Sequence, residues 1–225
     1  MLELWEFIGQ IYKLVLVLSF ISGLMFYKRL SATGRYLWVY FGLMIVCQVV
    51  SEYVGAILKN NHIILPVYCM VELGFFMCLF NMHLFKKFRT IPLITGALAM
   101  AYIAYEFTDN FIVHQVATKD FQPYCKIADN FCIMVYCLLY LFEKMKYNKV
   151  RTEKFPLTIG LLINFTLSSL FYLPFNFLVN QERAITFYFW IGNTILLVIY
   201  TGFLSFFILS PVLQKSLTSL PVKNK

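Results

Sequence analysis

The chain has 225 residues, of which 60% are hydrophobic and 13% are charged, and its formal net charge is +8. Soluble domains carry roughly 45–50% apolar and about 25% charged residues, so a soluble fold would leave too much apolar surface in water. The composition therefore excludes a soluble protein and predicts a single polytopic membrane domain over residues 1–225. The positive charge falls in loops rather than along one continuous stripe, which argues against nucleic-acid binding.

Seven apolar stretches occupy nearly all of the chain, and each is about long enough to cross a bilayer as a helix. Because backbone groups in lipid must be satisfied internally, these stretches predict an all-α bundle of seven transmembrane helices. The first stretch is expected to be a span rather than a signal peptide, since Glu3 and Glu6 stand where a basic region is needed. The expected spans are 5–27, 36–58, 63–85, 91–107, 124–145, 155–179 and 187–209.

Lysine and arginine concentrate in alternate loops. The loops after the second, fourth and sixth spans hold only Lys59, Lys119 and Arg183 beside acidic residues. The positive-inside rule then places the N-terminus outside and the C-terminus in the cytoplasm, in a multi-pass protein of the inner (cytoplasmic) cell membrane. The residues that mark the cytoplasmic side are Lys28, Arg29, Arg35, Lys86, Lys87, Arg89, Lys144, Lys146, Lys149, Arg151, Lys154, Lys215, Lys223 and Lys225.

The cysteines and histidines predict neither a metal site nor a cofactor. All six cysteines lie in or beside apolar stretches and none forms a Cys-x-x-Cys pair. His62, His83 and His114 lack the spacing of zinc ligands. No P-loop, dinucleotide fingerprint or nucleophile elbow occurs.

Three carboxylates inside the apolar stretches are the strongest functional candidates, because charge in a membrane is costly. At 1.5 Å per residue, Glu72 is expected about 15 Å deep, and Glu52 and Asp129 about 7–10 Å below the outer surface. Lys126 precedes Asp129 by one helical turn and is expected to pair with it at the interface. The three acids therefore point to the outer half of the bundle.

Other polar residues recur at helical spacing on single faces. Such stripes fit either interhelical hydrogen bonds or a hydrated cavity lined by the second, third, fifth, sixth and seventh spans. The stripes comprise Asn164, Ser168, Tyr172 and Asn176, then Asp129, Tyr136 and Tyr140, then Asn193 and Tyr200, then Tyr68 and Glu72, and finally Gln48 and Glu52.

A diffuse resemblance accompanies these features and covers most of the chain. The sequence resembles a set of small seven-helix bacterial membrane proteins of unknown function, which implies the fold and topology but no activity. Lysoplasmalogenase-type hydrolases share the architecture of several membrane helices with intramembrane acids. The residues that carry the first resemblance are Ser51-Glu52-Tyr53, Asn60-Asn61, Leu65-Pro66-Val67-Tyr68, Glu72 and Phe189-Trp190-Ile191-Gly192-Asn193.

The leading interpretation is a non-enzymatic protein that binds a small polar or cationic ligand in an outward-facing acidic pocket, as a receptor or a transporter. Signalling would need a partner membrane protein, because the cytoplasmic tail is short. The alternatives are a lipid hydrolase with paired carboxylates as general acid and base, and a structural membrane subunit. The expected ligand-binding residues are Glu72, Glu52, Asp129, Tyr68, Asn164, Asn193 and Tyr136.

Overall fold

A computed structural model describes residues 2–58, 62–85, 89–114, 122–147, 154–178 and 183–218, with side chains between residues 6 and 174 and between 187 and 212 of these ranges. These residues form helices and short connections, without a β-strand among them. The helices are α1 (Leu2–Met25), α2 (Ala32–Leu58), α3 (Ile64–Cys78), α4 (Thr90–Thr108), α5 (Tyr124–Lys146), α6 (Lys154–Leu178) and α7 (Arg183–Thr218).

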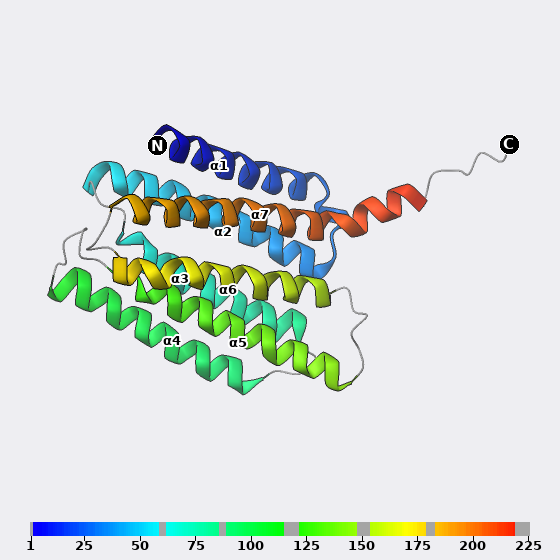
Figure 1. Cartoon of the computed structure of the whole chain (residues 1–225). Coiled ribbons are helices and arrows are strands. Elements are labelled where there is room, and N and C mark those ends of the chain that lie inside the picture. The colour runs from blue at the N-terminus through cyan, green and yellow to red at the C-terminus, as the bar shows by residue number, and fades with distance from the viewer. Residues whose placement is uncertain are drawn as a thin grey trace.

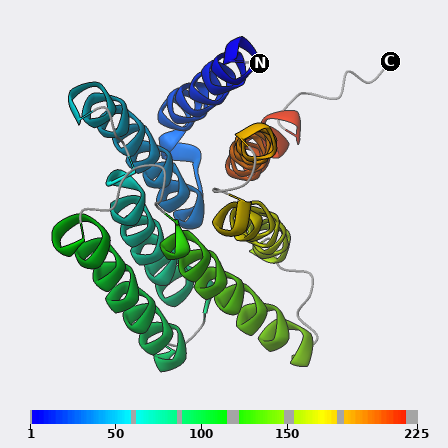
Figure 2. The same ribbon diagram turned by 60° about the vertical axis from the view of Figure 1, so that its left-hand side comes forward.

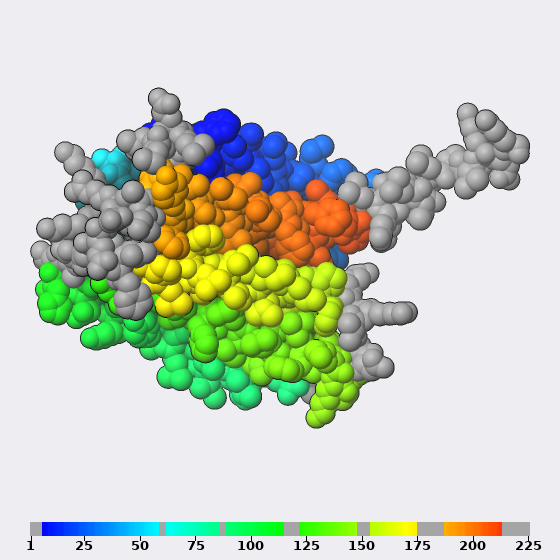
Figure 3. Space-filling view, in the orientation of Figure 1, coloured from blue at the N-terminus to red at the C-terminus, as the bar shows by residue number. Residues whose placement is uncertain are grey.

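Seven of the described helical segments are long and apolar enough to cross a membrane, which confirms the predicted number of spans. Large apolar side chains cover the outside of the bundle, for example Val46, Val49 and Ile57 on one face of α2. Figure 3 shows the side chains of α7, α6 and α5 forming one continuous face. These features are consistent with a multi-pass membrane protein.

Six of the helices form a closed ring, and the seventh lies outside it. Neighbours around the ring are α1, α2, α3, α5, α6 and α7; α7 returns to pack against α1, and it also contacts α2 directly. Helix α4 packs only on the outer side of this ring, against α3 and α5 (Figure 2). The ring can therefore enclose a space to which α4 has no access.

The predicted helix ends agree with the structure within about four residues, except at the ends of α4 and α7. Helix α3 continues as a π-helix (Leu79–Leu84), which ends one residue before the expected end at 85. Helix α4 continues as another π-helix (Asp109–Val113), six residues past its expected end at 107. Helix α7 runs on to Thr218 with Pro211 inside it, well past the expected end at residue 209. Of the predicted outer loop 108–122, residues 115–121 lie outside the described part of the chain, as do several residues of the basic loops.

The helix connections alternate between the two ends of the bundle. Helix α1 ends, α2 begins, α4 begins, α5 ends and α6 begins at the end of the bundle at which α7 ends (Figure 1). The described basic residues of the connections lie at this end, among them Lys28 and Arg29 between α1 and α2, Arg89 before α4, and Lys146 at the end of α5. The N-terminus of α1 and the start of α3, α5 and α7 lie at the other end, called here the N-terminal end.

Close packing of α4 depends on Gly96. A side-chain carbon at this position would lie 2.5 Å from the Tyr136 hydroxyl oxygen on α5 and 2.9 Å from the Met77 sulfur on α3. Gly96→Val is therefore expected to lower the free energy of unfolding by about 1–3 kcal/mol, the usual cost of overpacking. Denaturant titration in detergent measures this change. The control is Gly202→Val, where the added carbon has no atom within 4 Å and should cost less than about 0.5 kcal/mol.

Candidate functional site

A buried ion-pair cluster lies where α3 meets α5. Lys126 lies in the first turn of α5, and its ammonium contacts carboxylates of Glu72 on α3 and of Asp129, the latter at 2.7 Å. The exposed fractions of the three residues are 5%, 2% and 0% respectively. The expected pair of Lys126 with Asp129 is confirmed, and the structure adds Glu72 as a second partner. Lys126 points into the bundle because Glu72 supplies a second buried carboxylate.

Two tyrosines complete the surroundings of Glu72. The Tyr40 hydroxyl on α2 donates to Oε1 of Glu72 at 2.5 Å, and the Tyr68 hydroxyl donates to the same oxygen at 2.8 Å. Tyr68 reaches it because it lies four residues earlier on α3, on the same face. Three donors from α2, α3 and α5 thus hold one carboxylate, which compensates the cost of burying it.

The cluster has two carboxyl groups for one ammonium group. Its formal charge is therefore −1 with both carboxylates ionised, and zero with one proton on the pair. The Lys126 ammonium also lies over the rings of Tyr68 and Phe165, at 5.0 and 5.6 Å from their centroids. The aromatic faces stabilise the cation further, since their negative quadrupole attracts positive charge.

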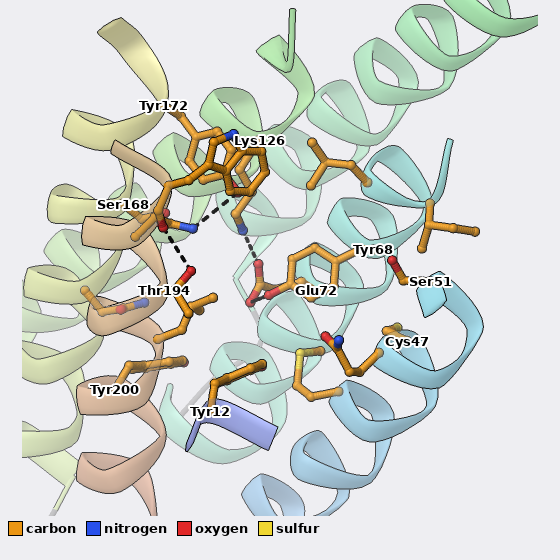
Figure 4. A pocket seen from close by; sticks show the side chains of 18 of the residues that line it. Tyr12, Cys47, Ser51, Tyr68, Glu72, Lys126, Ser168, Tyr172, Thr194 and Tyr200 are labelled. Carbon is orange, nitrogen blue, oxygen red and sulfur yellow. Dashed lines mark hydrogen bonds and ion pairs between the residues drawn. The ribbon is translucent and has the colours of Figure 1, made fainter. Parts of the chain in front are cut away.

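A cavity of about 550 Å³ lies beside this cluster, in the N-terminal half of the bundle (Figure 4). All six helices of the ring contribute to its wall, and α4 contributes none of the described lining residues. Its volume is in the range of small-molecule sites. Glu72 and Lys126 both line it, so the ion pair faces the cavity. Aromatic side chains form much of the remaining wall: Tyr12, Tyr68, Phe165, Tyr172, Trp190 and Tyr200.

Some polar atoms of the cavity wall have no hydrogen-bond partner among the described residues. They are Oδ1 of Asn164 and the hydroxyl of Tyr200, whose side chains are 6% and 4% exposed. Buried polar groups normally find a partner in protein, water or ligand. Both atoms expose almost no surface, so they do not face the open space of the cavity, although their residues line it.

Four of the predicted binding residues line the cavity: Glu72, Tyr68, Asn164 and Asn193. The Nδ2 group of Asn193 lies 3.5 Å from the Tyr172 hydroxyl, at the limit of a hydrogen bond.

The other three predicted residues lie elsewhere. Glu52 is exposed and pairs with Lys13 at 2.7 Å. Asp129 is fully buried behind Lys126. The Tyr136 hydroxyl donates to the Pro92 carbonyl oxygen at 2.8 Å, between α4 and α5. The polar stripes thus combine two functions, since some of their members line the cavity and others tie helices together.

Sequence reasoning missed several charged residues. The pairing of Lys126 with Glu72 was not predicted, and Lys13 was not singled out although it falls within the expected first span. Glu106 lies in the expected fourth span and is 6% exposed, away from the cavity. A scan for every ionisable residue inside the expected spans would have found Lys13 and Glu106. Tyr12 and Tyr40 carry no such signal, because tyrosine is common throughout this chain.

Within the described part of the chain, no three His, Cys, Asp or Glu side chains lie close enough together to hold a metal ion. His62 lies just before α3 and lines the cavity. Burial lowers the pKa of its imidazole below the ordinary value, which favours the neutral ring at pH 7. Neutral imidazole can donate or accept a hydrogen bond.

In comparisons with known proteins, no family model matches the chain, and neither a curated protein nor a solved structure matches it.

Proposed function

We propose that this multi-pass membrane protein binds a small polar ligand in the cavity enclosed by the six-helix ring. The observation that carries the proposal is the Lys126–Glu72 ion pair facing a space of about 550 Å³. A buried ion pair is a poor device for stability alone, because desolvation offsets its attraction. Its position on a cavity wall is better explained by recognition of a ligand.

The surroundings of Glu72 narrow the ligand class. Both of its oxygens already accept hydrogen bonds from Lys126, Tyr40 or Tyr68. A lone cation would have to displace Lys126, so the cluster favours a neutral or zwitterionic ligand over a simple cation. Such a ligand would engage the Lys126–Glu72 pair, with aromatic rings around its apolar part.

The side of entry follows from charge. The cavity lies in the half of the bundle opposite the basic loops, and the positive-inside rule assigns those loops to the cytoplasm. We therefore place the cavity in the outer half of the cytoplasmic membrane. Reception and transport differ in whether the ligand appears on the far side, which uptake into proteoliposomes measures.

A second candidate is an intramembrane lipid hydrolase, supported by the joining of two carboxyl groups, Glu72 and Asp129, on one ammonium. General acid–base catalysis needs both groups within reach of the substrate. Asp129 is fully buried and does not line the cavity, so its carboxyl has no direct access there. Binding without hydrolysis is the better-supported function. A purely structural subunit leaves the cavity and the ion pair on its wall unexplained.

The test is a binding screen with purified protein against amino acids, sugars, nucleosides and quaternary amines. Compounds that raise the thermal unfolding midpoint are titrated by the fluorescence of Trp190, which lines the cavity. Glu72→Gln is expected to weaken binding about 10-fold, or about 1.4 kcal/mol. The change removes the charge that orients Lys126, while Asp129 still pairs with that lysine.

The matched control is Glu143→Gln, which makes the same chemical change in a carboxylate that pairs with Arg89 at 3.0 Å near the C-terminal end of α5. It should leave affinity unchanged. Equal affinities of wild type and Glu72→Gln would remove Glu72 from the site. Absence of binding throughout the panel would contradict a role in recognising these compounds.

A further inference from the structure

The ion pair of Lys13 and Glu52 lies on the surface of the bundle that would face lipid, where α1 packs against α2. Nζ of Lys13 is 2.7 Å from Oε1 of Glu52, and the two side chains are 35% and 51% exposed. Both residues belong to membrane spans, Glu6–Met25 and Ala32–Leu58. Lys13 lies eleven residues after the start of α1 and Glu52 six residues before the end of α2, or about 16 and 9 Å along the helix axes. An exposed charged side chain at this depth in the bilayer is costly unless a polar or oppositely charged group pairs with it.

This pair is linked to the cavity through the seam between α1 and α2. Nε2 of Gln48 donates to Oε1 of Glu52 at 2.7 Å, and Gln48 itself lines the cavity. The neighbours of the pair in sequence, Tyr12 and Ser51, also line the cavity. Figure 4 shows Tyr12 on α1 and Ser51 on α2 on the side of the cavity away from Tyr172 and Ser168. The outer ion pair and the cavity therefore lie on opposite sides of a thin wall.

The chemistry of the seam selects one class of molecule. A group with both a cation and an anion can replace each partner of Lys13–Glu52 without leaving a charge unpaired. A group that is only cationic or only anionic would pair with one of the two residues and leave the other residue with an uncompensated charge. Behind the seam the cavity presents the same combination of charges again, in Lys126 and Glu72.

We propose that the Lys13–Glu52 pair is a lateral gate, through which the zwitterionic headgroup of a membrane lipid enters the cavity from the bilayer. The acyl chains stay outside, against the apolar surface of α1 and α2. The inference rests on the proposed function of the cavity, and adds the class of ligand and its route. Opening exchanges one ion pair for two new ones, so the gate responds to the headgroup and not to lipid in general.

The test uses the fluorescence of Trp190 as the only tryptophan, in a Trp5→Phe, Trp38→Phe background. The protein is reconstituted into vesicles of phosphatidylethanolamine or phosphatidylglycerol, each brominated on the acyl chains near the glycerol. Bromine quenches tryptophan on close approach. Quenching of Trp190 is expected to be at least about twofold stronger with the zwitterionic lipid, as expected for a modest difference in occupancy.

Charge variants test the chemistry of the gate. The exchange K13E/E52K keeps an ion pair and should keep the preference for phosphatidylethanolamine. The single change Lys13→Glu places two acids together and should abolish it. Equal quenching by the two lipids in wild type, or no effect of Lys13→Glu, would overturn the assignment of these residues.

A cross-link tests the route. Oxidation of K13C/E52C should close the seam and remove the quenching in phosphatidylethanolamine vesicles, and dithiothreitol should restore it; K13C alone, treated identically, should respond to neither reagent. If oxidation leaves quenching unchanged, the gate is wrong.

Soluble glycerophosphoethanolamine separates this failure from failure of the cavity itself. A Trp190 response to it that persists in the oxidised protein and is lost in Glu72→Gln would mean entry from the aqueous end, with the proposed function intact. Responses of Trp190 to lipid and to the soluble compound that Glu72→Gln leaves unchanged would overturn both proposals.

Discussion

Replacement of Lys126 by methionine is expected to destabilise the protein by about 3–5 kcal/mol, the range for removing one partner of a buried ion pair. The change leaves the carboxyl groups of Glu72 and Asp129 buried together without a cation. Titration with sodium dodecyl sulfate in mixed micelles measures the free energy of unfolding. The triple variant K126M/E72Q/D129N should recover most of the loss, since it removes the buried charges as well.

The matched control is Lys144→Met on the same helix. The Lys144 side chain is also buried, with its ammonium 4.9 Å from the centroid of the Tyr140 ring. Loss of this cation–π contact should cost about 0.5–2 kcal/mol. If the two methionine variants had equal free energies of unfolding, the ion pairs of Lys126 would contribute no more to stability than the cation–π contact of Lys144.

Thr194→Trp is expected to reduce ligand affinity by about 100-fold or more, equivalent to about 2.7 kcal/mol. Thr194 lines the cavity from α7, and an indole there would occupy space that a ligand needs. Its hydroxyl donates only to the Trp190 carbonyl one turn earlier, so little tertiary bonding is lost. The free energy of unfolding should change by less than about 1.5 kcal/mol, because an existing cavity receives the ring.

Ile195→Trp provides the comparison for this variant. Ile195 is the next residue on α7, is 44% exposed, and is not part of the cavity wall. The same indole should leave affinity unchanged there. Isothermal titration with a compound from the binding screen compares the two, and unchanged affinity in Thr194→Trp would place the ligand elsewhere.

The fold was predictable because the membrane imposes a simple length rule on an apolar sequence. The spans follow from runs of about 20 residues, and the ends of α5 and α6 are within a residue of the prediction. The continuation of α7 past Pro211 was not predictable, since proline ordinarily ends or kinks a helix. The position of α4 outside the ring was also not predictable, because hydropathy shows which segments are spans but not which helices are neighbours in the bundle.

The site was predictable only in part, for a reason visible at Lys126. Local spacing correctly paired it with Asp129, three residues away. Its second partner, Glu72, is 54 residues distant, and only the packing of α3 on α5 brings them together. Glu52 was selected for the same reason as Glu72, yet its face of α2 turns outward toward Lys13. Depth in the membrane can be counted from a sequence, whereas the direction of a side chain around the bundle depends on its neighbours.

The distance in sequence between Glu72 and Lys126 also bears on how the chain is made. A ribosome delivers α3 before α5, so the Glu72 carboxylate arrives at the translocon before its counter-ion exists. An uncompensated acid at mid-span costs about 2.5–3.5 kcal/mol on insertion scales. Helix α3 therefore gains its full drive to integrate only when α5 follows. The order of synthesis therefore predicts that α3 completes its integration only after α5 has been made.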